Sequence, residues 1–252
     1  MSPHQLSDFP AITVASGQDG ILTVTLQRPD SRNAMSHDLV ESLLDLLGQE
    51  EAREAGAIVL NGSGRGFCAG SDLVGLAALD EAGRRSFEAA SGLLARQMVA
   101  HPRPIIAAVH GFAIGGGLTL AAACDIVVTT AAAKWSLPEV PIGLFPAWGL
   151  EAIEHRTGRA RARRLCFGFD TIDGATAAAW GLADIVAEDP LESAIQLARR
   201  LGGMPASQVA AVKEYFSDTH TGAEADERAN RLFIDACATE AAVASFARHG
   251  RA

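Results

Sequence analysis

The segment that most constrains the fold is IIAAVHGFAIGGGLTLAAACD, which runs from Ile105 to Asp125. Its first part, up to Cys124, has no formally charged side chain and is long enough to cross a membrane. However, His110, Gly111 and the glycine triplet 115–117 divide this stretch, and two prolines precede it. A buried strand, a turn and a buried helix therefore explain the segment better than a membrane span.

The flanking segments predict an alternation of strands and helices. Residues 12–16 and 21–26 alternate in polarity around a glycine-containing turn, which is typical of a β-hairpin. Ser36 is a good N-cap for a helix whose apolar positions follow helical spacing. These positions are Leu39, Val40, Leu43, Leu44 and Leu47.

Further along the chain, the pattern predicts strands at 57–60, 105–109 and 126–128 and helices at about 84–99 and 116–123. From Gly149 onward the pattern is largely helical, with 184–187 as one strand-like interruption. This order predicts a single α/β core followed by a helical C-terminal region.

Charge and cysteine content narrow the function. The formal net charge is −9, which argues against a nucleic-acid partner because phosphate binding needs a basic face. The four cysteines form no CxxC pair, so we expect free thiols and a reducing, cytoplasmic location. Residues 1–10 contain no apolar stretch of the kind found in secretory signals. The seven histidines include no HExxH motif, so we expect no metal site.

The loop Gly64–Asp72 is rich in glycine and follows the predicted strand 57–60. Clustered glycines allow a backbone to approach a ligand closely. Gly64, Gly66 and Ala69 also match the spacing of a dinucleotide-binding fingerprint. A helix should begin inside such a fingerprint, but Gly70-Ser71-Asp72 prolongs the loop, so we reject dinucleotide binding and keep an ordinary loop as the alternative to a ligand site.

Two further segments have features of a reactive site. The glycines at 115–117 stand where a helix begins, and free amides at a helix N-terminus suit an oxygen that gains negative charge. Close packing of the helix on the strand is the alternative reason for these glycines. Glu139 lies among leucine, proline, valine and isoleucine, where burial would raise its pKa toward the range of a general base. A solvated loop glutamate is the alternative here.

Taken together, these segments resemble the crotonase (enoyl-CoA hydratase/isomerase) superfamily over nearly the whole chain. The matching stretches are LQRPDSRNAM (26–35), GFCAGSDL (66–73), HGFAIGGGLTLAAACD (110–125), WSLPEVPIGLFPAWG (135–149) and TIDGATAAAWGLADIV (171–186). Their presence in this order is more specific than any one of them alone.

The resemblance implies the ClpP/crotonase fold, an α/β spiral of ββα units with a helical C-terminal trimerisation region. It places the core at residues 1–190 and the helical region at 191–252 of the same domain. It implies an acyl-CoA thioester as ligand, with no cofactor beyond the CoA that the substrate carries. The expected assembly is a homotrimer or a dimer of trimers, with no nucleic-acid or membrane partner.

The resemblance also implies roles for individual residues. The backbone N–H groups of Ser71 and Gly116 would form an oxyanion hole for the thioester carbonyl. The CoA and substrate contacts would fall on Arg32, Ala34, Ala69, Gly70, Asp72 and Leu73, with Asp72 ordering its loop rather than acting as a catalyst. Glu139 matches the catalytic glutamate, and Trp148 with Phe145 could line the acyl pocket or belong to the core.

The sequence departs from a hydratase at one position. Hydratases of this family place a second glutamate two residues after the glycine triplet, and here that residue is Thr119, which cannot act as a carboxylate base. An aspartate found in some relatives corresponds to Ala147. A single glutamate is sufficient for a Δ3,Δ2-enoyl-CoA isomerase, because one group can move a proton from C2 to C4.

Several alternatives stay open. They are hydration of a 2-enoyl-CoA, decarboxylation or C–C bond chemistry through the same enolate, and a catalytically silent CoA-binding subunit. A serine hydrolase is not supported, because the chain contains no GxSxG motif. The sequence also leaves open whether Asp80, Glu81 or Glu88 reaches the pocket in place of the missing glutamate.

Overall fold

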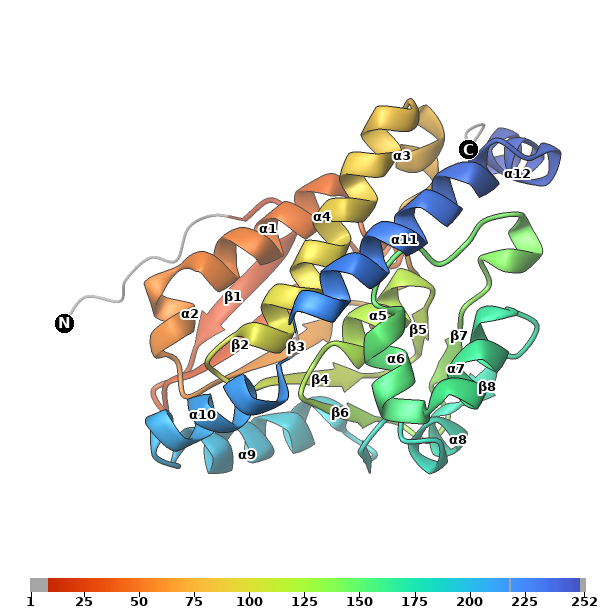
Figure 1. Ribbon diagram of the computed structural model, residues 1–252. Helices are drawn as coiled ribbons and strands as arrows, with labels where there is room; N and C mark the ends of the chain where they lie inside the picture. The colour runs from red at the N-terminus through yellow and green to blue at the C-terminus, as the bar shows by residue number, and fades with distance from the viewer. Residues whose placement is uncertain (1–8, 218, 250–252) are drawn as a thin grey trace.

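The computed structural model describes residues 9–217 and 219–249, so most of the segment 1–10 lies outside the described residues (Figure 1). A six-stranded sheet forms its centre, in the order β1-β2-β3-β4-β6-β9. Its strands are β1 (Ile12–Ser16), β2 (Ile21–Leu26), β3 (Ala57–Gly62), β4 (Ile105–Val109), β6 (Ile126–Thr129) and β9 (Ile185–Val186). The β1–β2 pair is the predicted antiparallel hairpin, and every later neighbour in this sheet pairs in parallel.

A second, small sheet was not predicted. It consists of β5 (Phe112–Ile114), β7 (Lys134–Ser136) and β8 (Ile172–Asp173). β5 and β7 pair in parallel, whereas β7 and β8 pair antiparallel. Strands of two or three residues are too short for alternation to reveal them, so β8 also interrupts the region predicted as helical.

Helices surround the sheets. They are α1 (His37–Gly48), α2 (Glu50–Glu54), α3 (Leu73–Ala78), α4 (Glu81–Ala100), α5 (Gly116–Ala122), α6 (Leu150–Thr157), α7 (Arg159–Cys166), α8 (Gly174–Ala179), α9 (Pro190–Gly202), α10 (Ala206–Phe216), α11 (Thr219–Cys237) and α12 (Glu240–His249), with short 3-10 turns η1 (Pro29–Ser31) and η2 (Val140–Ile142).

Capping side chains set the starts of two predicted helices. Ser36 accepts a hydrogen bond from the Leu39 amide at 3.3 Å and caps α1, as predicted. The helix predicted from residue 84 begins earlier, at Glu81, because Asp80 accepts a hydrogen bond from the Gly83 amide at 2.8 Å. On α1 the predicted apolar face is buried except for Leu44, which is half-buried.

The two faces of the large sheet differ in their cover. Helix α9 packs on one face against β2, β3, β4 and β6, where small side chains such as Ala194 and Ala198 allow close contact. The main hydrophobic core lies on the other face and includes residues of α1, α4 and α5. The segment 105–124 contains the predicted buried strand and buried helix, and the short strand β5 lies in the stretch predicted as a turn. No helix in the described part of the chain is both long and apolar enough to cross a membrane.

The C-terminal helices return across the molecule toward the N-terminal half. Helix α11 runs beside α4, and α12 contacts α3 and η2 (Figure 1). Before them, the buried Lys213 of α10 fixes the chain to the core through an ion pair with Asp125, with 2.6 Å between Nζ and Oδ2. All four cysteines are free thiols, as predicted, and burial raises the pKa of Cys68 to about 12.

Candidate active site

The loop between β3 and α3 is fixed against the segment that precedes α1. The Met35 amide donates to the Gly70 carbonyl at 2.8 Å, and the Asp72 amide donates to the Met35 carbonyl at 2.9 Å. These two hydrogen bonds use the carbonyl of the residue before Ser71 and the amide of the residue after it. Among the described residues the Ser71 N–H donates no hydrogen bond, so it is available to a ligand.

The turn between β5 and α5 presents a second free amide. Gly115 has a φ of +53° and donates its own N–H to the Ser136 carbonyl at 2.9 Å. Gly116 begins α5, and its amide has no acceptor within the described ranges. A Cβ built on Gly116 would lie 3.5 Å from the Ser71 nitrogen, which shows how closely the two loops approach.

Glycine is required where the two loops touch. A Cβ on Gly117 would lie 2.4 Å from the Cys68 carbonyl oxygen, so the packing alternative considered for the glycine triplet applies to this residue. Gly70 has a φ of +93°, and a Cβ there would lie 2.9 Å from the Ile114 carbonyl oxygen. The loops are joined directly by a hydrogen bond of 3.0 Å from the Ile114 amide to the Cys68 carbonyl.

Glu139 follows β7 and immediately precedes η2, so the small sheet sets its position. A Cβ at Gly115 would lie 2.6 Å from its Oε1 atom, which places the carboxyl beside the turn that presents the Gly116 amide. Its Oε2 atom is buried and has no hydrogen-bond partner in the described structure. Burial raises the pKa of Glu139 to about 7, so the carboxyl can exchange a proton near neutral pH.

Thr119 lies in α5, three residues after Gly116, and is 2% exposed. Its hydroxyl donates to the Gly116 carbonyl at 2.9 Å, so its proton is engaged with the helix backbone. Ala147 also lines the pocket and supplies no polar group. Neither residue therefore adds a second acid or base.

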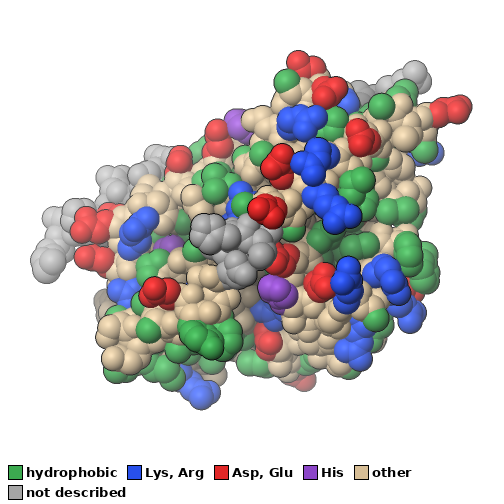
Figure 2. Space-filling model, in the orientation of Figure 1, with side chains coloured by type: hydrophobic (Ala, Val, Ile, Leu, Met, Phe, Trp, Pro, Cys, Tyr) green, Lys and Arg blue, Asp and Glu red, His purple; other side chains and the backbone are tan. Residues whose placement is uncertain are grey.

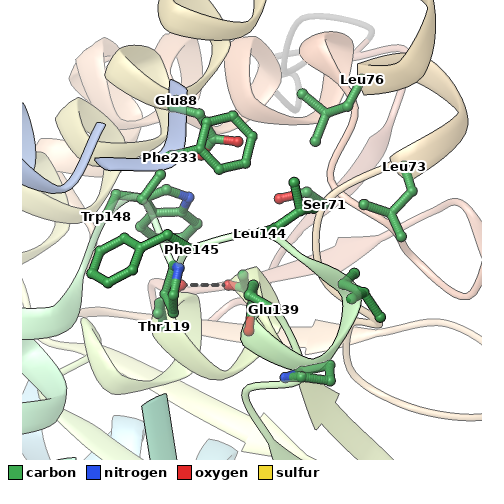
Figure 3. A pocket seen from close by; sticks show the side chains of 15 residues that line it. Ser71, Leu73, Leu76, Glu88, Thr119, Glu139, Leu144, Phe145, Trp148 and Phe233 are labelled. Atoms are coloured by element: carbon green, nitrogen blue, oxygen red, sulfur yellow. Dashed lines mark hydrogen bonds between the residues drawn. The ribbon is translucent and has the colours of Figure 1, made fainter. Parts of the chain in front are cut away.

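Several of the predicted residues line one pocket (Figure 3). It is lined by Ser71, Leu73, Leu76, Glu88, Gly116, Thr119, Pro138, Glu139, Ile142, Leu144, Phe145, Pro146, Ala147, Trp148 and Phe233. Trp148 is 3% exposed, so it belongs both to the pocket wall and to the core. The wall is apolar apart from a few hydroxyl, amide and carboxyl groups.

Of the three other carboxylates considered from the sequence, only Glu88 lines the pocket. Asp80 caps α4, and Glu81 is exposed and pairs with Arg85 at 3.2 Å. Glu88 lies in α4, is 3% exposed and faces the pocket from the side of α11. The sequence did contain a signal for its burial, because Glu88 continues the spacing of Ser91, Ala95 and Met98 on the inner face of α4.

The remaining residues predicted to contact CoA do not line this pocket. Arg32 and Ala34 lie beside it in the segment before α1, and Ala69, Gly70 and Asp72 belong to the loop that carries Ser71. Asp72 caps α3 by accepting from the Gly75 amide at 3.2 Å. Its other oxygen, Oδ2, pairs with Arg28 at 3.0 Å.

Two residues that order this region were missed from the sequence. Asn33 is fully buried, and its Nδ2 donates to the carbonyls of Ser63, Gly66 and Phe67 at 2.8 to 3.1 Å. Arg28 joins the Ala34 carbonyl to Asp72. The φ of Asn33 is +55°, in the left-handed region that asparagine tolerates. The sequence signal that could have identified it is an asparagine in the short segment between the strand 21–26 and the helix capped by Ser36.

The site contains the groups that acid–base chemistry needs. Within the described ranges, no group of three or more His, Cys, Asp or Glu side chains is placed to hold a metal ion. Two free amides and a carboxyl of raised pKa converge on an apolar pocket, an arrangement that can hold a carbonyl oxygen while a proton moves nearby.

Comparison with known proteins gives consistent matches. A family model described as enoyl-CoA hydratase/isomerase matches residues 16–245. The chain is 35% identical over 167 residues to "Probable enoyl-CoA hydratase" of Mycobacterium tuberculosis, covering 66% of this chain and 67% of that one. It is 32% identical over 213 residues to a 1,2-epoxyphenylacetyl-CoA isomerase of Escherichia coli, covering 81% of each.

A solved structure agrees with these matches. The crystal structure of an enoyl-CoA hydratase/isomerase from Mycobacterium paratuberculosis superposes with a TM-score of 0.87 at 27% identity. The match covers 96% of this chain and 100% of that one. The names of these relatives include both hydratases and an isomerase.

Proposed function

The chain is an enzyme of the enoyl-CoA hydratase/isomerase family with the crotonase fold, acting on acyl-CoA thioesters, and we propose that it converts 3-enoyl-CoA into 2-enoyl-CoA with Glu139 as the base. The environment of Glu139 supports an isomerase rather than a hydratase. The Glu139 carboxyl lies beside the two free amides, and Thr119 occupies the position where a hydratase of the family carries its second glutamate.

In the proposed reaction the thioester oxygen accepts hydrogen bonds from the Ser71 and Gly116 amides. The Glu139 carboxylate removes a proton from C2, and the negative charge of the resulting dienolate develops on that oxygen. The same carboxyl then returns the proton at C4, so the double bond moves into conjugation and no atom is gained or lost. An oxyanion-hole donor of this kind is worth about 3 kcal/mol of barrier.

Binding of the substrate completes the proposal. Arg32, Ala34, Ala69, Gly70, Asp72 and Leu73 lie along the segments that hold the CoA moiety, and Trp148 bounds the acyl group. The shift of a double bond is redox-neutral, so the enzyme uses no cofactor beyond the CoA of the substrate.

A homotrimer, or a dimer of trimers, is part of the same proposal. Large apolar side chains are exposed on α10 and after α7, and apolar side chains are visible over α10 in Figure 2. They include Phe167, Phe169, Val212, Tyr215 and Phe216. Contact of this surface with further copies of the chain would remove apolar area from water. A light-scattering mass equal to that of a single chain would contradict the proposed trimer.

The experiment that tests the reaction follows ultraviolet absorbance with a 3-enoyl-CoA and a 2-enoyl-CoA in parallel. The isomerase forms the conjugated thioester from the first substrate and consumes little of the second. Rapid loss of conjugation from the 2-enoyl substrate, with little activity on the 3-enoyl one, would instead identify a hydratase.

A further inference from the structure

Glu88 is a buried carboxyl that the proposed reaction does not use. It projects from the middle of α4 into the acyl pocket, where it lies beside Phe233 and well apart from Glu139 (Figure 3). Only 3% of the residue is exposed. An alanine or leucine at this position would pack α4 equally well. Packing therefore does not explain why the residue is a glutamate.

The pocket leaves the Glu88 carboxyl without a partner. In the part of the chain that the structure describes, no hydrogen bond or ion pair is formed by it, and no lysine or arginine lines the pocket. Arg84, one turn earlier on α4, donates to the Leu76 carbonyl and lies over the Phe246 ring. The titratable groups around Glu88 are therefore Glu139 across the pocket, Cys237 on α11 and this engaged arginine.

These surroundings keep Glu88 protonated at neutral pH. Burial, and secondarily the negative charge of Glu139, raises the pKa of Glu88 to about 8. At neutral pH the buried, unpartnered carboxyl is therefore largely a neutral carboxylic acid. A neutral carboxyl carries an O–H donor, and the pocket presents it beside Phe233, away from Glu139.

A plain alkyl chain is a poor match for this group. It would displace water from the carboxyl and supply no hydrogen bond in return, which penalises binding. A carboxylate on the acyl group is also a poor match, because the described lining offers no cation and already contains Glu139. A neutral keto or hydroxyl oxygen satisfies the donor without adding charge.

We propose that Glu88 determines specificity by donating a hydrogen bond to a neutral oxygen on the acyl group, so that the preferred substrates are oxygenated acyl-CoA thioesters. This inference rests on the proposed placement of the acyl group in the pocket, but it does not depend on the double-bond shift.

The test compares the binding of two saturated thioesters by calorimetry. One is a straight-chain acyl-CoA, and the other has the same length with a keto oxygen near the end of the chain. Neither can be isomerised or hydrated, so binding is measured apart from reaction. The wild-type protein should bind the keto thioester about tenfold more tightly, the scale of one hydrogen bond to a buried group.

Two substitutions at Glu88 separate recognition from other roles. Glu88→Gln keeps an N–H donor and should keep most of the preference for the keto thioester. Glu88→Leu removes the donor, so the preference should disappear or reverse in favour of the plain chain. Glu81→Gln is the matched control, because Glu81 lies on the same helix but is exposed and outside the pocket, and it should leave both affinities unchanged.

Three results would overturn the inference. The first is equal binding of the two thioesters by the wild-type protein. The second is a preference that persists in Glu88→Leu. The third is a loss of turnover of a plain 3-enoyl-CoA in both Glu88 variants with an unchanged binding ratio, which would make Glu88 a proton-transfer group. Failure of the isomerase proposal would appear only in the turnover assay and would leave the binding difference intact.

Discussion

The carboxyl of Glu139 lies against Gly115 so closely that a Cβ at Gly115 would be 2.6 Å from Oε1. Gly115 therefore has two functions in the fold: its φ of +53° turns the chain into α5, and its lack of a side chain leaves room for the carboxyl. The position of the proposed base thus depends on a residue in the loop that presents the Gly116 amide.

Gly115→Ala should reduce activity more than stability. The new methyl group displaces the Glu139 carboxyl, and the backbone of Gly115, with a φ of +53° and a ψ of −126°, adds strain of about 1–3 kcal/mol for any other residue. We expect kcat/KM for the 3-enoyl-CoA to fall by about a hundredfold, measured together with a thermal melt. Gly48→Ala is the matched control, because nothing lies within 4 Å of a Cβ there and its φ is not left-handed. Equal kcat/KM values for the two variants would contradict this arrangement.

Glu139→Gln should abolish most of the isomerisation and leave CoA-thioester binding in place. The amide fills the same space but cannot accept the C2 proton, and general-base catalysis contributes about 10²–10⁴-fold. Single-substrate kinetics with the 3-enoyl-CoA measure the loss in kcat, and calorimetry with a saturated acyl-CoA measures binding. Glu41→Gln, at an exposed position paired with His37, is the control. Full activity in Glu139→Gln would require another base.

Thr119→Val should change stability and not isomerisation. The valine keeps the shape of threonine and removes the hydroxyl that donates to the Gly116 carbonyl. We expect turnover of the 3-enoyl-CoA to stay within about threefold of wild type and the free energy of unfolding to fall by about 1 kcal/mol. Thr157→Val is a matched control, because its buried hydroxyl makes the same type of bond, to the Ile153 carbonyl at 2.8 Å, outside the pocket. A large loss of turnover confined to Thr119→Val would indicate that this hydroxyl positions a reactant.

The longer elements of the fold were predictable because their burial leaves a periodic pattern. The strand β4 and helix α1 each bury enough apolar residues for spacing to identify them. The strands β5, β7 and β8 are too short for this, and they form because backbone groups brought together by the rest of the fold pair with one another. The position of Glu139 depends on this unpredicted sheet, so the sequence could indicate its chemistry but not its contact with Gly115.

The candidate site was predictable where a motif fixes the local backbone. Ser71, Gly116, Glu139 and Trp148 do line one pocket. The sequence could not single out Glu88 from Asp80 and Glu81 as the carboxylate in the pocket. Its position in the pocket depends on the packing of α11 over α4, a contact between segments far apart in the sequence. Asn33 was missed for a similar reason, since its three backbone acceptors lie in a loop that only the tertiary structure brings next to it.

The pH dependence of isomerisation should follow the ionisation of Glu139. Its pKa is raised by burial to about 7, and only the ionised form can remove a proton, so kcat/KM should rise about tenfold per pH unit below about pH 6 and level off above about pH 8. A keto-substituted substrate should also lose affinity above about pH 8, as Glu88 loses its donor proton. The Glu88→Gln variant should lack this alkaline loss and keep the acid limb. A value of kcat/KM that stays constant from about pH 5 to about pH 8 would exclude Glu139 as the base.

The ionisation of Glu88 should make the free energy of unfolding fall as the pH rises. Burial, with a further contribution from Glu139, raises the pKa of Glu88 from 4.5 to about 8 in the folded state. The folded protein therefore binds more protons than the unfolded chain between these two values. The contribution of Glu88 is fully present below pH 4.5 and is lost as the pH rises to about 8, by at most about 1.4 kcal/mol per pH unit.

Glu88→Gln removes this titration, so the stability of the variant relative to wild type should increase steadily from about pH 5 to about pH 8. Urea denaturation at several pH values measures both free energies of unfolding. The difference between them is the informative quantity, because Asp19 and Asp173, whose pKa values are lowered by hydrogen bonds, titrate in both proteins and cancel. A pH-independent difference for Glu88→Gln would mean that Glu88 is ionised in the folded protein at neutral pH, and the pocket would then present an acceptor instead of a donor.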